Sequence, residues 1–191
     1  MDEREKALAE VTEHTDTVFE GPIFRVEVSE VRLPNGKTAR RDVVRHPGAV
    51  CVLPIDRDGR VYLVRQWRAG FRGMTLEIPA GKLDHGETDA EKAAERELRE
   101  ETGALAARMT PLGDYYGSPA ILDERIAMYL AEDLTFGETD FDEDEFLAPV
   151  TMPLDDLVRE VLAGRIPDGK TQVAALRAYC MRRGLPGENG K

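Results

Sequence analysis

A group of carboxylates near the middle of the chain has the clearest potential for chemistry. Residues 87–101 have helical character, and Glu97, Glu100 and Glu101 fall close together within it. At about 100° per residue, Glu97 and Glu101 flank Ala90 at the edge of the helix's apolar stripe. Like charges at this spacing repel, and partial burial raises the cost. A divalent cation such as Mg²⁺, which prefers carboxylate oxygens, would compensate them.

A solvated helix with ion pairs, such as Arg96 with Glu100, is the competing interpretation. The position of Glu97 beside the buried face argues against it. The preceding segment, Leu76 to Glu87, reads as the end of a strand, a Pro-Gly turn and a loop. The backbone carbonyl of Ala80 could therefore face the same metal. No GKS/T or GxGxxG pattern is present, so neither a P-loop nor a dinucleotide fingerprint is indicated.

The elements that must position these residues follow from hydrophobic periodicity and turn residues. The helix over 88–102 should begin at a capping box of Thr88 with Glu91 and end before Gly103. The continuous apolar run Ala49–Ile55 predicts a strand covered on both faces. The pattern predicts a short helix at 2–11, strands between 18 and 44 around a turn at 34–36, strands at 61–64, 109–116 and 125–131, and helices at 154–164 and 171–183. This order favours an α/β or α+β sandwich.

Composition limits the classes of function. The 191 residues include 26 Lys and Arg against 37 Asp and Glu, for a net charge of −11, which argues against a nucleic-acid partner. Cys51 and Cys180 lack the spacing of a zinc site, and two reduced thiols are expected. The chain shows neither the order of a signal peptide nor an apolar run of about 18 residues. We therefore expect a soluble, cytoplasmic protein with no membrane partner.

The spacing Gly81-x5-Glu87…Arg96-Glu97-Leu98-x-Glu100-Glu101-x-Gly103 resembles the Nudix box, GX5EX7REUXEEXGU. The single departure is that eight residues, 88–95, separate Glu87 from Arg96, where the pattern has seven. The extra residue should lie where the helix begins, because everything from Arg96 onward is in register. Further segments resemble the ADP-ribose pyrophosphatase branch of the Nudix hydrolases, namely Arg45–Ala49, Val64–Arg68, Leu76–Gly81, Gly117–Pro119 and Asp142–Phe146.

The resemblance implies an α/β fold, a Nudix-type α/β/α sandwich with a mixed sheet and an N-terminal antiparallel β subdomain. Residues 1–45 would form that subdomain, exchanged between the protomers of a homodimer, and residues 46–191 would form the hydrolase domain. Similar proteins hold metal ions through the residues matched here by Ala80, through its carbonyl, and by Glu97 and Glu101. Mg²⁺ is the expected ion, with Mn²⁺ as an alternative.

The resemblance also implies roles for residues around the metal. Glu100 would be a further ligand or would assist the base, and Arg96 would brace the carboxylates. The substrate would be bound by Arg68 at the diphosphate, Glu77 at the ribose, Arg40 or Arg41 from the N-terminal strands, and the loop of Ser118, where Ala120 replaces the glycine of many relatives. A glutamate of a late acidic loop would position or deprotonate the attacking water, with Glu145 as first candidate and Glu143 as second.

The function implied is Mg²⁺-dependent hydrolysis of ADP-ribose to AMP and ribose 5-phosphate. Clustered carboxylates suit this reaction, because two metal ions can neutralise a diphosphate and activate water. One alternative keeps the chemistry and changes the substrate to another nucleoside diphosphate sugar, such as GDP-mannose. The other is a module that senses ADP-ribose without cleaving it, which the complete carboxylate set disfavours. Core packing, rather than stacking on adenine, is expected for Trp67, Tyr115 and Tyr116.

Overall fold

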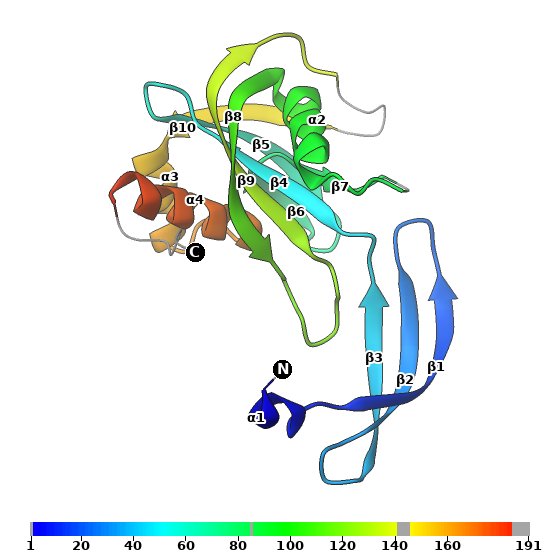
Figure 1. The fold of residues 1–191 in the computed structure, drawn as a ribbon. Helices are drawn as coiled ribbons and strands as arrows, with labels where there is room; N and C mark the ends of the chain where they lie inside the picture. Colours follow the sequence, from blue (N-terminus) through cyan, green and yellow to red (C-terminus); the bar gives the residue numbers. More distant parts are fainter. Residues whose placement is uncertain (1, 85, 141–145, 185–191) are drawn as a thin grey trace. The chain divides into compact units, whose positions relative to one another are not determined.

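A computed structural model describes residues 2–84, 86–140 and 146–184 (Figure 1). The chain divides into two compact units. The first comprises Met1–Gly48 and Tyr116–Arg125, and the second comprises Ala49–Tyr115 and Ile126–Lys191. The chain therefore passes from one unit to the other and back at 116–125, a return that the sequence patterns did not predict.

The first unit is a three-stranded antiparallel sheet with the strand order β1-β2-β3. Its elements are the single-turn helix α1 (Glu3–Lys6) and the strands β1 (Val11–Glu20), β2 (Arg25–Arg32) and β3 (Thr38–Arg45). The helix predicted over 2–11 is wrong beyond residue 6, and β1 begins earlier than expected. The many β-branched residues of Val11–Glu20 explain this, because they lose side-chain freedom in a helix.

The segment 116–125 closes this unit through backbone and charged contacts with the end of β3. Val44 donates its N–H to the carbonyl of Ile121 at 2.8 Å and accepts one from Asp123 at 3.1 Å. Arg45 forms ion pairs with Glu27 at 2.7 Å and with Asp123 at 3.1 Å. Its hydrogen bond to Glu27 is the main reason why the pKa of that carboxyl lies below its ordinary value.

The second unit is built on a four-stranded sheet with the order β7-β4-β9-β8. Its central strand β4 (Ala49–Pro54) is buried at all six residues and runs parallel to β9 (Ile126–Phe136). The antiparallel edges are β7 (Ala80–Lys82) and β8 (Ala104–Tyr115). The complete burial of β4 confirms the prediction of a strand covered on both faces.

Helices cover both faces of this sheet (Figure 1). Val50 and Val52 of β4 pack with Leu98 of α2 (Ala90–Thr102) on one face. Cys51 and Leu53 contribute to the opposite core. That core also contains residues of α3 (Leu154–Leu162), α4 (Gly169–Arg182) and a second sheet, ordered β10-β5-β6, made of β10 (Ala148–Pro153), β5 (Arg60–Arg68) and β6 (Gly73–Glu77). The predicted α/β sandwich is confirmed.

The N-cap of α2 lies one residue later in the chain than predicted. Asp89, not Thr88, is its N-cap and accepts a hydrogen bond from the N–H of Lys92 at 3.3 Å. The α-helix runs from Ala90 to Thr102, so Thr88 and Asp89 precede its first residue, and the place of the extra residue of the Nudix-like spacing stays a prediction. Gly103 ends the helix in the left-handed conformation, as expected, and donates its N–H to the Arg99 carbonyl at 2.8 Å.

None of the helices in the described part of the chain is long and apolar enough to cross a membrane. Cys51 is buried and Cys180 is partly exposed, and both are free thiols, as predicted. Burial raises the pKa of the Cys51 thiol to about 12, so this side chain is a packing residue of β4 rather than a nucleophile.

Replacing Gly103 with alanine should destabilise the second unit by about 2–4 kcal/mol. The residue has φ of 69°, and an added Cβ would lie 2.5 Å from the Gly137 carbonyl oxygen. Gly164→Ala is the matched control, since φ is 70° there and no atom lies near the new methyl group. We expect the control to lose only about 1–2 kcal/mol in chemical denaturation. Equal losses would show that the contact with Gly137 is unimportant.

Candidate active site

Two carboxylates of α2 lie on its buried side, next to the short strand β7. Glu97 is only 8% exposed and Glu101 only 2%. The Glu97 carboxylate lies so close to Gly81 that a Cβ at that position would overlap it. Ala80, the preceding residue of β7, pairs with Cys51 of the central strand. The Glu97 carboxylate and the Ala80 backbone are thus brought to one edge of the sheet, and Glu101 lies one turn further along α2.

Arg96 joins the acidic residues of this region. Its guanidinium donates to Glu97 at 2.8 Å, to Glu100 at 3.1 Å and to Glu87 at 3.3 Å. Burial opposes the charged form, but Glu97 and the other nearby carboxylates hold the pKa of Arg96 above its ordinary value. This is the contact that a bracing role requires. Glu87 contacts Arg96 although one more residue separates them than in the Nudix pattern.

The donor set fits a hard divalent cation. It consists of oxygen atoms from Glu97, Glu101 and, at the exposed end, Glu100, with the carbonyl of Ala80 as a neutral donor. Gly81 leaves room for the Glu97 carboxylate where any larger residue would displace it. Within 2–84, 86–140 and 146–184, no three His, Cys, Asp or Glu side chains already converge tightly enough to enclose an ion.

Arg68 and Glu77 form a second charged centre at the ends of β5 and β6. The guanidinium donates one hydrogen bond to each oxygen of Glu77, both at 2.8 Å. Thr75 donates to the same carboxylate at 2.6 Å, and Glu77 is 1% exposed. The structure thus brings these two predicted residues together. A direct contact of Glu77 with a ribose, as the resemblance implies, would have to compete with these bonds.

Sequence reasoning missed three residues that complete this centre. The ammonium of Lys170 contacts Glu77 directly and lies 2.9 Å from Asp168. Asp168 is the N-cap of α4, and Thr171 accepts the N–H of Ile78 at 2.9 Å. The N-cap could have been found from Asp168 and the helical pattern after it. The pairing of Lys170 with a carboxylate 93 residues away leaves no signal in a single sequence.

The two charged centres influence each other. Burial alone would raise the pKa of Glu77, but Arg68 and Lys170 outweigh that effect and hold it at about 2. Hydrogen bonding to Glu77 in turn raises the pKa of Arg68, and the charge of Glu101 adds to this. Because Coulomb interactions fall off with distance, the Arg68 guanidinium lies within electrostatic range of the Glu101 carboxylate of α2.

The remaining predicted site residues belong to other parts of the chain. Arg40 pairs with Asp42 at 2.7 Å, and Arg41 pairs with Glu10, both within the first unit. Ser118 also belongs to the first unit, and its carbonyl accepts the N–H groups of residues 121 and 122. Their substrate contacts stay predictions. Glu143 and Glu145, the candidate bases, lie outside the described residues.

The aromatic residues behave less uniformly than expected. Trp67 is 61% exposed, and Tyr116 is also exposed, so the expectation that both pack in the core is wrong. Tyr115 is partly buried against the core, as expected. Trp67 lies next to Arg68 on β5 and pairs across the sheet with Met74, which is exposed as well. Because side chains alternate along a strand, Trp67 and Met74 lie on the opposite face of these strands from Arg68, Thr75 and Glu77.

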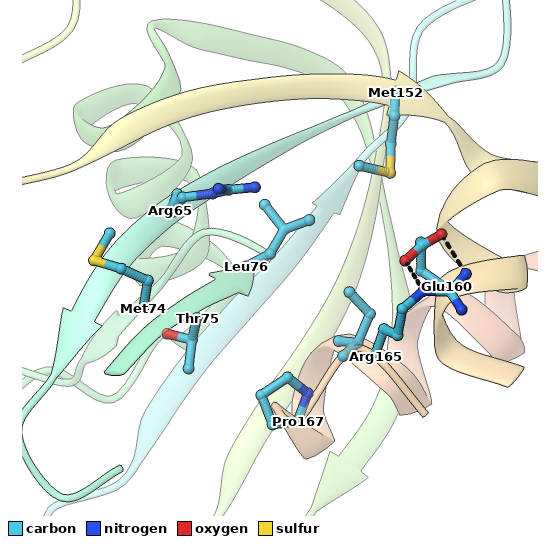
Figure 2. Close-up of a pocket in the computed structure, with 9 residues that line it drawn as sticks. Arg65, Met74, Thr75, Leu76, Met152, Glu160, Arg165 and Pro167 are labelled. Atoms are coloured by element: carbon cyan, nitrogen blue, oxygen red, sulfur yellow. Dashed lines mark hydrogen bonds and ion pairs between the residues drawn. The ribbon is translucent and has the colours of Figure 1, made fainter. Parts of the chain in front are cut away.

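A pocket of about 300 Å³ lies near these strands but has a different lining (Figure 2). The ion pair of Glu160 with Arg165 borders it. No predicted site residue lines this pocket, whose walls are Arg65, Met74, Thr75, Leu76, Met152, Glu160, Arg165, Ile166 and Pro167. It is thus distinct from the carboxylate cluster, although Thr75 is common to the pocket and the Glu77 centre.

Comparison with known proteins identifies the class to which this arrangement belongs. The family model of the NUDIX domain matches residues 44–176, which is most of the chain. The chain therefore belongs to the Nudix family and is a hydrolase of that family, as the spacing of the carboxylates predicted.

Two relatives and one solved structure extend this result. The ADP-ribose pyrophosphatase of Bacillus subtilis (strain 168) is 40% identical over 171 residues, covering 88% of this chain and 92% of its own. The methanol dehydrogenase activator of Bacillus methanolicus has the same identity and coverage. A crystal structure of an ADP compounds hydrolase superposes with a TM-score of 0.72 at 26% identity, covering 94% of this chain and 98% of that one. These matches confirm the predicted fold and the pyrophosphatase branch.

Replacing Gly81 with alanine should weaken metal binding by about 10-fold to 100-fold, because the new methyl group would displace the Glu97 carboxylate. Mn²⁺ binding followed by electron paramagnetic resonance would measure this. Gly70→Ala is the control, since no atom lies within 4 Å of its added Cβ. Unchanged Mn²⁺ affinity in Gly81→Ala would place the metal away from Glu97.

The Glu77 carboxyl should make the free energy of unfolding depend on pH. Its pKa is about 2 in the folded chain against an ordinary value of 4.5, so its contribution is complete above pH 4.5 and is lost as the pH falls towards 2. We expect Glu77→Gln to unfold more easily than the wild type at neutral pH. The difference in unfolding free energy should narrow by roughly 3 kcal/mol between about pH 6 and about pH 2. A difference that stays constant with pH would contradict the assignment.

Proposed function

We propose that the protein hydrolyses ADP-ribose to AMP and ribose 5-phosphate with Mg²⁺, or Mn²⁺ in its place. The observation that carries the proposal is the pair of nearly buried carboxylates of α2, Glu97 and Glu101, with that of Glu97 held beside Gly81. Relatives named for hydrolysis of ADP-ribose and ADP compounds match most of the chain.

The reaction breaks one phosphoanhydride bond. Oxygen from water attacks phosphorus, the bridging oxygen leaves with the other phosphate, and the proton of the water passes to a base. Glu97, Glu101 and the carbonyl of Ala80 would hold the divalent ions. When bound, such ions neutralise phosphate charge and lower the pKa of water. Glu145 or Glu143 is the proposed base.

The chain's own cations would perform the binding. Arg68 has a side chain about half exposed, and Glu77 fixes two of its N–H groups, which leaves the other donors of its guanidinium available to a phosphate. Arg96 would keep Glu97 and Glu100 in place between metal-binding events. With a chain charge of −11, such local cations and bound metal are what would attract an anionic substrate.

Glu97→Gln should reduce kcat/KM for ADP-ribose by about 100-fold or more, because a buried metal-binding carboxylate becomes an amide. Glu95→Gln is the matched control, as it makes the same change on the exposed side of α2 and should leave activity unchanged. AMP release with Mg²⁺ would be measured. Full activity in Glu97→Gln would contradict the metal assignment.

A panel of nucleoside diphosphate sugars ranked by kcat/KM would test the substrate. A preference for ADP-ribose would support the proposal, and a preference for GDP-mannose or another nucleotide sugar would overturn it. Binding of ADP-ribose without turnover, across metals and pH, would instead point to a sensing or activating role. The complete set of Glu97, Glu100 and Glu101 argues for turnover.

We further propose that the protein is a cytoplasmic homodimer formed through its first unit. In the three strands of this unit, only Ser29 and Val31 are buried, and β1 is exposed over its entire length. Val18 and Phe19 are among its exposed apolar side chains. A long exposed strand with apolar residues favours pairing with a second chain. The free thiols support a reducing compartment.

Val18→Glu should convert the dimer into monomers, because a carboxylate in an apolar interface would be costly to bury. Light scattering would give the mass, which should be twice the chain's 21.3 kDa for the wild type. Leu105→Glu is the control, since Leu105 is a comparably exposed apolar residue of the second unit. A monomeric wild type would reject the proposal.

A further inference from the structure

Lys170 is a buried cation to which the reaction outlined above assigns no part. It is 8% exposed, although it lies in the first turn of α4. Its ammonium contacts Glu77 and Asp168. Together with Arg68, these residues form a group of two positive and two negative charges. The group joins β5, β6 and α4, which are far apart in the sequence.

A lysine at this position costs stability that an apolar side chain would not. Removing an ammonium from water is unfavourable by several kcal/mol, and a buried ion pair regains that energy only with good geometry. Apolar residues of the same core, such as Ala174 and Ala175, lie one turn further along α4. Packing alone therefore does not explain why a lysine occupies position 170.

The hydrogen bonds that Glu77 accepts explain the presence of this lysine. Each carboxylate oxygen accepts one bond from Arg68 and one from a second donor. Oε1 accepts from Arg68 Nε and from Thr75, and Oε2 accepts from the other Arg68 nitrogen and from Lys170. Thr75 and Lys170 thus hold the two carboxylate oxygens to which the Arg68 guanidinium also donates. Without Lys170, Oε2 would lose its second donor, and only Arg68 and Thr75 would hold the carboxylate.

The same turn of α4 also anchors the segment between β6 and β7, which leads to the proposed metal ligand Ala80. Thr171 accepts the Ile78 N–H at 2.9 Å, and Asp168 accepts the Thr171 hydroxyl at 2.6 Å. Ile78 is two residues before Ala80. The start of α4 therefore fixes both the Glu77 side chain and the backbone beyond it.

We propose that Lys170 is a positioning residue for substrate binding, which acts through Glu77 to fix the Arg68 guanidinium in the orientation that receives a diphosphate. This inference rests on the proposed function for the identity of the ligand. It assigns Lys170 no contact with substrate, metal or reacting water. Its effect should therefore appear in the binding of the diphosphate rather than in the chemical step.

Kinetics would separate these effects. Lys170→Met should raise KM for ADP-ribose about tenfold or more, while kcat changes less than about threefold. Lys92→Met is the control, since Lys92 forms only an exposed pair with Asp89 and should leave both constants unchanged. Unchanged KM in Lys170→Met would overturn the proposal, as would an equal loss in kcat.

A double-mutant cycle would show whether Lys170 acts through Glu77. In Glu77→Gln, the additional change Lys170→Met should alter KM less than about twofold, because the carboxylate it orients is gone. This double variant also removes both partners of the buried pair, so it guards against a single variant that fails to fold. Independent, multiplying effects of the two changes on KM would overturn the proposal.

A spectroscopic measurement needs no turnover. The Nε–H group of Arg68, bonded to Glu77, should give a separate, slowly exchanging ¹⁵N–¹H signal in the ligand-free protein. This signal should broaden or disappear in Lys170→Met and persist in Lys92→Met. An unchanged signal would overturn the role of Lys170. Should the wild type cleave no nucleotide sugar, the proposed function fails, and this signal still decides the positioning of Arg68.

Discussion

The burial of ionised carboxylates is the constraint on which this structure depends. A charge removed from water is costly unless partners or a metal compensate it. The second unit contains two such sites, at Glu97 with Glu101 and at Glu77. The first is paired with Arg96 and is the site that we propose for metal, whereas the second is paired with Arg68 and Lys170. Opposite charges thus compensate the buried carboxylates of Glu97 and Glu77.

The sandwich places these two sites close together from opposite layers. The central strand β4 is buried on both faces, so it separates the side chains of one layer from those of the other. On one face, α2 brings the Glu97 carboxylate to β7. On the other, the first turn of α4 contacts Glu77, the last residue of β6, and Ile78, which follows it. The chain between β6 and β7 is therefore held from both sides of the sheet.

Local patterns predicted the parts of the site that lie on one element. The α2 carboxylates were found because helical periodicity alone sets their face, and β4 because continuous apolar residues imply two covered faces. Lys170 was missed since its partner depends on tertiary packing. The N-cap shifted to Asp89 because either of two adjacent polar residues can cap. Trp67 is exposed although aromatic, which shows that residue type alone does not decide burial.

The return of the chain at 116–125 bears on how the protein can be divided by engineering. The backbone of Val44 forms hydrogen bonds with that segment, and the side chain of Arg45 forms an ion pair with it. A chain truncated after residue 48 would therefore lack the partners of Val44 and Arg45. Carbonyl and amide groups that are now satisfied would then need water or a new neighbour. A chimera with a foreign amino-terminal sheet would accordingly have to transplant residues 116–125 together with the first 48.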